Sequence, residues 1–196
     1  MLTPSYKFCP SYKLTKSIIK KLQYTYVDQN IFVIDSGLIS VGYASVLFET
    51  AVLNSTGIRC EDLVKKITKI IKSYQTLIIP NNNNFELFSN FNYAKSLGIK
   101  PIIGLSNNKL ELLKTVKGKL NLANEVNNLI NHMGLNVGDY PVGIMNGKSN
   151  LNDANKIINQ INNSFDTKVF AGNYCPTLVN QIGDNALIIS FHKRND

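Results

Sequence analysis

The stretch from Asn30 to Gly57, NIFVIDSGLISVGYASVLFETAVLNSTG, places a short apolar run directly before a helical pattern. The run NIFVI is continuous and rich in β-branched residues, which is typical of a buried strand in a parallel sheet. It ends at Asp35 and Ser36, after which apolar residues recur at helical spacing until Gly57, a residue suited to a C-terminal cap. A strand that leads through a polar turn into a helix is the unit of α/β folds, so this stretch predicts that class.

The same alternation continues along the chain. An amphipathic helix is predicted over 61–74, followed by a strand over 76–80. Further helices are predicted over 86–98, 120–133 and 150–162, and further strands over 99–105, 109–116, 140–145, 167–172, 177–181 and 186–191. Pro101 confines its strand to an edge or to a strand start, because proline cannot donate to the ladder. The boundary between two lobes is expected near residue 75.

The composition excludes several classes of protein. With 44% hydrophobic and 17% charged residues, the 196-residue chain should fold rather than remain disordered. No run reaches the roughly 18 apolar residues of a membrane span, and the N-terminus lacks a signal-peptide apolar region, so we expect a cytoplasmic location. The three cysteines, Cys9, Cys60 and Cys175, have no metal-type spacing, and neither a zinc site nor a disulfide framework is predicted.

The net charge of +8 is compatible with nucleic acid, an anionic ligand or an anionic membrane surface. The lysines are scattered, however, and no aromatic residues alternate with them as in a nucleic-acid motif. We therefore expect solvated lysines and no specific nucleic-acid binding. Peripheral contact with a membrane and the oligomeric state are left open.

Polar residues follow the first long strand, where ligands lie in open α/β sheets. Asp35, Ser36 and Ser40 stand at this position, although short polar side chains also satisfy backbone donors at a turn or a helix start. The sequence has no phosphate-binding glycine loop, and His132 and His192 fall on a helix and after the last strand. These features favour a binding protein over an enzyme, without a metal or a cofactor.

Several motifs, in order, resemble the DegV family of bacterial proteins, which bind a fatty acid and present it to a fatty acid kinase. The first runs through Val-Ile-Asp-Ser at 33–36, then Ser40, Gly42, Glu49, Ala51 and Gly57. It is followed by GIKPII at 98–103, KTVKGKLNL at 114–122, GIMNGKSNLNDA at 143–154 and CPTLVNQIGDNALIISF at 175–191. The resemblance covers most of 30–191.

The resemblance implies an α/β fold with a truncated N-terminal α/β lobe over 1–75 and a second α/β lobe, with a mixed sheet, over 76–196. It implies a long-chain fatty acid between the lobes and no catalysis by this chain. The family's turn histidine falls on Gln181, with Gly183 retained, and the carboxylate-contacting serine falls on Thr15. Ser36 would shape the crevice. Two basic residues would meet an acyl phosphate or the kinase, namely Lys117 and Lys119.

The change from histidine to Gln181 separates this sequence from the family pattern. Glutamine can donate a hydrogen bond, but it cannot titrate or become a cation as histidine does. Three hypotheses therefore remain: a fatty-acid-binding protein, a degenerate relative that acts as an interaction module, and an unrecognised enzyme on the same fold. Acyl-chain preference and the partner are open. We also expect a partner or ligand to cover an apolar face near Ile18, Ile19, Ile31 and Val33.

Overall fold

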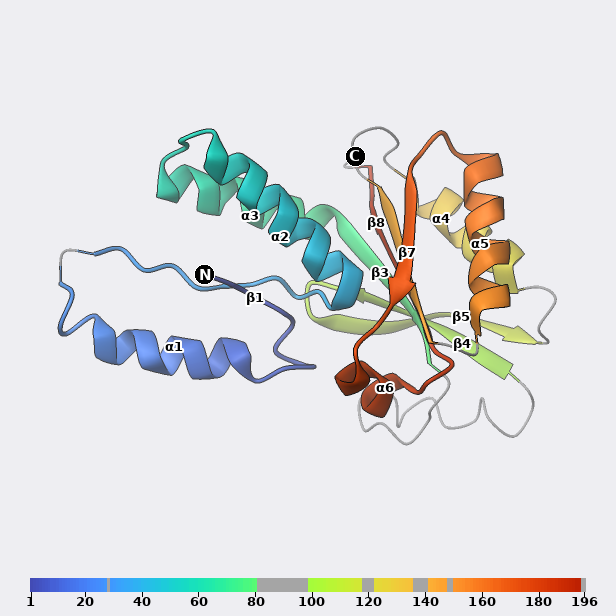
Figure 1. The fold of residues 1–196 in the computed structure, drawn as a ribbon, viewed down its shortest axis with the longest axis horizontal. Coiled ribbons are helices and arrows are strands. Elements are labelled where there is room, and N and C mark those ends of the chain that lie inside the picture. The colour runs from blue at the N-terminus through green and yellow to red at the C-terminus, as the bar shows by residue number, and fades with distance from the viewer. Residues whose placement is uncertain (28, 81–98, 118–121, 136–140, 148–149, 195–196) are drawn as a thin grey trace.

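A computed structural model gives the fold and describes residues 1–27, 29–80, 99–117, 122–135, 141–147 and 150–194 (Figure 1). The helices are α1 (Ser11–Leu22), α2 (Ser40–Ser55), α3 (Cys60–Ser73), α4 (Leu122–Met133), α5 (Leu151–Ser164) and α6 (Pro176–Ile182). The strands are β1 (Leu2–Thr3), β2 (Ile34–Asp35), β3 (Tyr74–Ile79), β4 (Ile99–Ser106), β5 (Lys109–Lys117), β6 (Val142–Asn146), β7 (Val169–Asn173) and β8 (Leu187–His192). The predicted α/β class is confirmed.

The centre of the molecule is a six-stranded sheet with the order β5-β4-β3-β8-β6-β7. Only β6 and β7 pair in parallel, so the sheet is mixed, as expected. The strands β1 and β2 form a separate two-stranded parallel sheet. This small sheet lies with α1 on the opposite side of the molecule from α4 and α5 (Figure 1).

The two faces of the main sheet carry different layers. The helices α4 and α5 cover one face, where Val126, Ile130 and Ile157 join a large buried apolar cluster with β3, β6 and β8. The other face packs against the start of α2, against α6 and against the N-terminal segment, through Phe8 and Ile182. Because successive strand residues point to opposite faces, each central strand contributes to both clusters.

The start of α2 lies unusually close to the sheet because glycines stand at the contact. A Cβ atom on Gly143 of β6 would come within 2.0 Å of Val41 Cγ2. A Cβ atom on Gly42 of α2 would lie 2.8 Å from Ser190 Oγ and 2.9 Å from Thr76 Oγ1. These two hydroxyls hydrogen-bond each other at 2.8 Å and are fully buried, so both polar groups are satisfied beneath the helix.

Most of the predicted elements are present within a few residues of their expected bounds, and Pro101 stands near the start of β4, before the stretch that pairs with β3. The buried strand predicted over 30–34 is wrong in extent and burial, because only Ile34 and Asp35 pair, as β2, and residues 31–35 are half-buried. The strand predicted over 177–181 is wrong, because these residues belong to α6. Pro176 begins this helix in the first turn, where its missing N–H costs nothing, and Gly183 ends it with a φ of +95°. The predicted helix over 86–98 lies outside the described residues.

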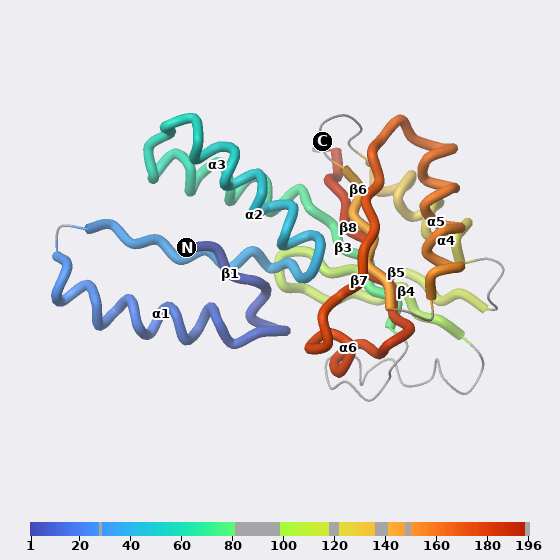
Figure 2. The backbone as a smooth tube through the Cα atoms, viewed as in Figure 1, coloured from blue at the N-terminus to red at the C-terminus, as the bar shows by residue number. Residues whose placement is uncertain are grey.

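The N-terminal part forms an arm that leads away from the main sheet in α1 and returns through residues 23–27 and 29–33 to β2 (Figure 2). On α1, Leu14, Ile18 and Leu22 follow one another at a spacing of four and are exposed. The expected apolar face is therefore uncovered at Ile18, whereas Ile19 is buried. Ile31 and Val33 are half-buried. We call Leu14, Ile18 and Leu22 the α1 stripe.

The contact between Gly143 and Val41 gives a test of the packing of α2. The variant Gly143→Ala should lower the free energy of unfolding by about 1–3 kcal/mol, because the new methyl group overpacks a buried contact. In Gly143→Ala/Val41→Ala, the shortened Val41 side chain should accommodate the methyl group. The double variant should therefore lose less than the sum of the two single losses in urea unfolding. Additive losses would show that Val41 does not restrict this position.

Candidate functional site

The turn between β2 and α2 is held by its own polar side chains. Asp35 Oδ1 accepts a hydrogen bond from the Gly37 amide at 3.0 Å, and Gly37 has a φ of +64°, which glycine adopts without strain. Ser36 is fully buried, and its Oγ accepts a hydrogen bond from the Leu38 amide at 3.2 Å. Ser36 and Asp35 therefore order the turn that leads into α2.

Asn108 connects this turn with the N-terminal segment. Its Nδ2 donates to Asp35 Oδ2 at 2.7 Å, and its Oδ1 accepts a hydrogen bond from Ser5 Oγ at 2.5 Å. Ser5 is fully buried, and its amide donates to the Leu38 carbonyl at 2.8 Å. The β4–β5 turn, the β2–α2 turn and the N-terminal segment thus share one hydrogen-bond network, which we call the Asn108 network.

Gln181 lies where α6 meets the N-terminal segment. Its Nε2 donates to the Phe8 carbonyl at 3.1 Å. The turn after α6 is fixed by the hydroxyl of Tyr174, which donates to the Gly183 carbonyl at 2.7 Å and lies 3.2 Å from the Ala186 carbonyl. Burial raises the pKa of Tyr174 to about 12, so this hydroxyl remains a donor at neutral pH.

The predicted site residues fall into two groups. Ser36 joins the Asn108 network, and Gln181 and Gly183 lie at the end of α6, so both groups contact the N-terminal segment that carries Ser5 and Phe8. Thr15 lies on α1, half-buried, and within the described chain no hydrogen bond joins it to Gln181. The roles of these residues in ligand binding therefore stay predictions.

Lys117 is the last residue of β5 and is exposed. It is eight residues from Lys109, which begins the strand beside Asn108, and eight strand residues span about 26 Å. Lys117 therefore lies at the far end of the β4–β5 hairpin from the Asn108 network. Lys119 lies outside the described residues.

A hollow of about 720 Å³ lies between α2, α3 and β7, and we call it the apolar groove. Its lining includes Phe48, Val52, Leu53, Ile70 and Phe170, with Glu49, Tyr74 and Lys168 as polar members. The apolar groove cannot be predicted from the sequence pattern, because its lining comes from separate segments. The one signal for the groove in the sequence is that α2 carries apolar residues on more than one face. In the structure Phe48 and Val52 lie outside the buried face of α2 and are exposed.

Glu49 and His192 are titratable groups whose pKa values are shifted by burial. Tyr74 donates its hydroxyl to Glu49 Oε1 at 2.6 Å, which partly offsets the rise that burial causes in the pKa of Glu49. Burial lowers the pKa of His192, whose Nε2 lies 2.6 Å from Ser73 Oγ. The Ser73 hydroxyl is buried and donates to the Ile70 carbonyl at 2.7 Å, so it satisfies a backbone acceptor at the end of α3.

Metal-ligand clusters, cysteines and membrane-spanning helices are three further features that bear on the class of protein. Among the described residues, no group of three or more His, Cys, Asp or Glu side chains is close enough to hold a metal ion. The cysteines Cys9, Cys60 and Cys175 are free thiols. Within the same ranges, no helix has the length and apolar character needed to cross a membrane.

Comparison with known proteins assigns the fold. No protein-family model and no curated protein matches the sequence. Among solved structures, the Fatty Acid Kinase B3 protein of Streptococcus pneumoniae, loaded with linoleic acid, has a TM-score of 0.84 at 15% identity over 98% of this chain and 70% of its own. A DegV family protein of Eubacterium eligens, loaded with heptadecanoic acid, has a TM-score of 0.81 at 16% identity over 98% and 72%.

A third structure, the fatty acid binding DegV family protein of Streptococcus agalactiae, has a TM-score of 0.80 at 14% identity over 100% of this chain and 71% of its own. The class defined by these likenesses is an α/β fold with a mixed sheet. In particular, it is the fold of DegV family proteins, which confirms at the level of the fold the resemblance found in the sequence. The described chain corresponds to about 70% of the length of these proteins.

Asn108 offers a test of the network with a matched neighbour. Asn107 and Asn108 have φ values of 50° and 60°, so glycine fits both positions. Asn108→Gly removes two partly buried hydrogen bonds and should lower the free energy of unfolding by about 1–3 kcal/mol. Asn107→Gly loses only an exposed 3.5 Å contact with Ser106 and should change little. Urea unfolding and hydrogen exchange at the Ser5 amide measure both effects, and equal behaviour of the two variants would contradict the bridging role.

The raised pKa of Glu49 predicts a pH dependence of stability. A raised pKa means that the folded protein holds the proton more tightly, so this stabilisation is complete below the usual value of 4.5 and is lost as the pH rises through the folded value. Glu49→Gln keeps an acceptor for Tyr74 but cannot titrate. Relative to the wild type, the variant should gain stability between pH 4 and pH 7, measured by urea unfolding. A constant difference across this range would exclude the shift.

Proposed function

We propose that the chain binds a long-chain fatty acid and does not itself catalyse a reaction. The observation that carries the proposal is the Gln181 side chain, which lies at the junction of α6 and the N-terminal segment in a fold shared with proteins loaded with linoleic and heptadecanoic acids. A fatty acid needs apolar lining for its chain and a few donors for its carboxylate. This junction offers both.

The donor chemistry at the junction is that of a neutral amide. Gln181 carries two N–H groups on Nε2, and one of them donates to the Phe8 carbonyl. The second N–H has no partner in the described ranges and is the donor that we assign to a carboxylate oxygen. Because the amide does not titrate, this anchor should hold a carboxylate equally well across neutral pH.

The apolar lining lies beneath the same junction. Phe8, Tyr174 and Ile182 belong to the buried cluster on this face of the sheet, with Leu178 and Val179 of α6 packed against it. An acyl chain placed along this cluster takes the position of Phe8, which the N-terminal segment contributes. The hydrogen bond from Gln181 holds the segment to α6 through the Phe8 carbonyl, so the Phe8 side chain can leave the cluster while the second N–H of Gln181 binds the carboxylate.

Presentation of the acyl group to a kinase is the finer part of the proposal. Lys117 is exposed at the end of β5, and Lys119 follows it in the sequence, so both are assigned to contact with an acyl phosphate or an acidic partner surface. A lysine offers a compact charge without the bidentate geometry of arginine. The contact should therefore weaken as salt increases.

Titration of a fluorescent fatty acid tests the anchor. Gln181→Ala should weaken binding roughly tenfold or more, because a hydrogen bond to a charged acceptor contributes about 1.5–3 kcal/mol. Gln181→His should preserve or strengthen binding, increasingly as the pH falls toward about 6.5 and a cation forms. Gln160→Ala, on the helix that covers the opposite face of the sheet, is the matched control and should bind like the wild type.

The outcomes separate the anchor from its alternatives. Equal binding by all variants would remove Gln181 from the site. If Val52→Asp in the apolar groove abolished binding while Gln181→Ala did not, the acyl chain would lie in the groove. A wild-type chain that binds no fatty acid would contradict the function itself and favour the interaction module.

A further inference from the structure

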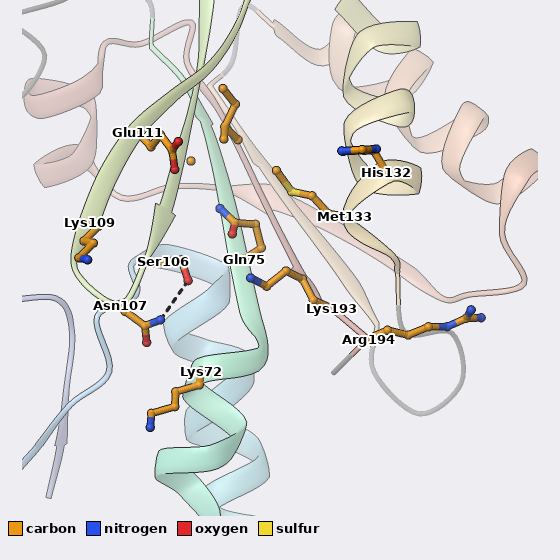
Figure 3. A pocket seen from close by; sticks show the side chains of 12 residues that line it. Lys72, Gln75, Ser106, Asn107, Lys109, Glu111, His132, Met133, Lys193 and Arg194 are labelled. Carbon is orange, nitrogen blue, oxygen red and sulfur yellow. Dashed lines mark hydrogen bonds between the residues drawn. The ribbon is translucent and has the colours of Figure 1, made fainter. Parts of the chain in front are cut away.

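A second hollow, of about 700 Å³, lies at the end of the main sheet where α3 leads into β3, and we call it the basic pocket (Figure 3). Its polar and charged lining comes from four parts of the chain. These are Lys72 and Gln75 around the start of β3; Ser106, Asn107, Lys109 and Glu111 of the β4–β5 hairpin; His132 at the end of α4; and Lys193 and Arg194 after β8.

Positive charge dominates this lining. Four cationic side chains, Lys72, Lys109, Lys193 and Arg194, meet a single carboxylate, that of Glu111. Three ion pairs are present in the described part of the chain, and all join residues outside the basic pocket. Like charges that converge without counter-charge repel one another, so an anion bound among them would be favoured.

The backbone keeps the floor of the pocket open. Gly104 pairs with Glu111 across the hairpin, and its missing side chain leaves the space above Gln75 and Leu113. A Cβ atom there would lie 2.8 Å from Leu113 Cδ1 and 3.0 Å from Gln75 Nε2. A residue larger than glycine would therefore force the ends of the Leu113 and Gln75 side chains to move.

The strand geometry and the close-up agree on how the charged groups are arranged. Lys109 and Glu111 are two residues apart on β5 and therefore point to the same face. In Figure 3, Lys193 extends toward Gln75, whereas the amine of Lys72, at the end of α3, points away from Gln75. Arg194 points away from the centre. The three lysines line the hollow on long flexible stems, so their amines are the groups able to reach a ligand.

We propose that the basic pocket binds a small molecule that carries a phosphate group, with Lys72, Lys109 and Lys193 as its counter-charges. A phosphate or diphosphate carries more than one negative charge, as a site with several uncompensated cations requires, and lysine binds phosphate as a point charge. Gln75 and Asn107 add amide donors at the floor and the rim. A concave lining of this size suits a small ligand rather than a nucleic-acid strand.

This inference is independent of the proposed fatty acid function. Leu113 and Met133 of the basic pocket pack against the apolar cluster under α4 and α5. The Gln181 junction borders the cluster on the opposite face of the sheet through Ile182. The two sites are therefore separated by the sheet itself, and each can be tested without the other.

Isothermal titration with inorganic pyrophosphate tests the proposal, with sodium chloride at matched ionic strength as the blank. The wild type should bind pyrophosphate, and the double variant Lys72→Ala/Lys193→Ala should bind at least about tenfold more weakly, because charge-assisted hydrogen bonds are lost. Glu111→Gln should bind more tightly than the wild type, since it removes the one carboxylate facing the anion. The control Lys65→Ala/Lys156→Ala, with exposed lysines outside the pocket, should bind like the wild type.

The result that overturns the proposal is distinct in each arm. Absence of pyrophosphate binding to the wild type would exclude the site. Equal weakening in the control and pocket variants would show attraction by net charge alone, and unchanged or weaker binding in Glu111→Gln would show that the anion does not lie beside this carboxylate. Binding of vesicles that contain phosphatidic acid, lost in the pocket variant while pyrophosphate fails to bind, would assign the basic surface to a membrane instead. The circular dichroism melting curves of all variants should match, because the substituted lysines line the surface.

Discussion

The seating of α2 on the main sheet is the contact on which the remaining geometry depends. Gly143 and Gly42 allow the helix and the sheet to approach, and the buried pair Thr76 and Ser190 satisfies its polar groups beneath them. The close approach fixes the start of α2 and therefore the turn that precedes it. Through Asn108 this turn positions the N-terminal segment, which in turn meets α6 at Gln181. A packing contact between two glycines and their neighbours thus determines where the candidate anchor lies.

The sheet also divides the molecule chemically, because neighbouring residues of one strand serve different faces. On β3, Thr76 lies under α2, whereas Gln75 lines the basic pocket on the side of α4. An apolar junction with a neutral amide donor therefore stands on one face, and a cationic pocket stands on the other. The scattered lysines of the sequence become a local cluster only when α3, the β4–β5 hairpin and the residues after β8 converge.

Sequence patterns predicted the elements whose burial is regular. The apolar stripes of α4 and α5 arise because one face of each helix is buried, whereas the continuous apolar runs of β3 and β8 arise because both faces of these strands are buried. The run Thr177 to Gln181 is too short for its hydrophobic period to distinguish a strand from a helix. Pro176 before its start and Gly183 after its end favour the helix α6. Short polar side chains after a strand also indicate turn residues, and Asp35 and Ser36 have this role in the structure. The Asn108 network and the two hollows could not be predicted, because their partners lie far apart in the sequence.

The long sequence separations around the N-terminal segment bear on the order in which the chain folds. Ser5 Oγ donates to Asn108, which lies 103 residues later in the sequence. The Phe8 carbonyl accepts a hydrogen bond from Gln181, which lies 173 residues later. The central strand β8 also follows the other described strands of the sheet in the sequence. Contacts between distant residues close large loops and form slowly. During synthesis these two contacts therefore form only after Asn108 and Gln181 have emerged, and the exposed α1 stripe is presented to solvent and to chaperones throughout that interval.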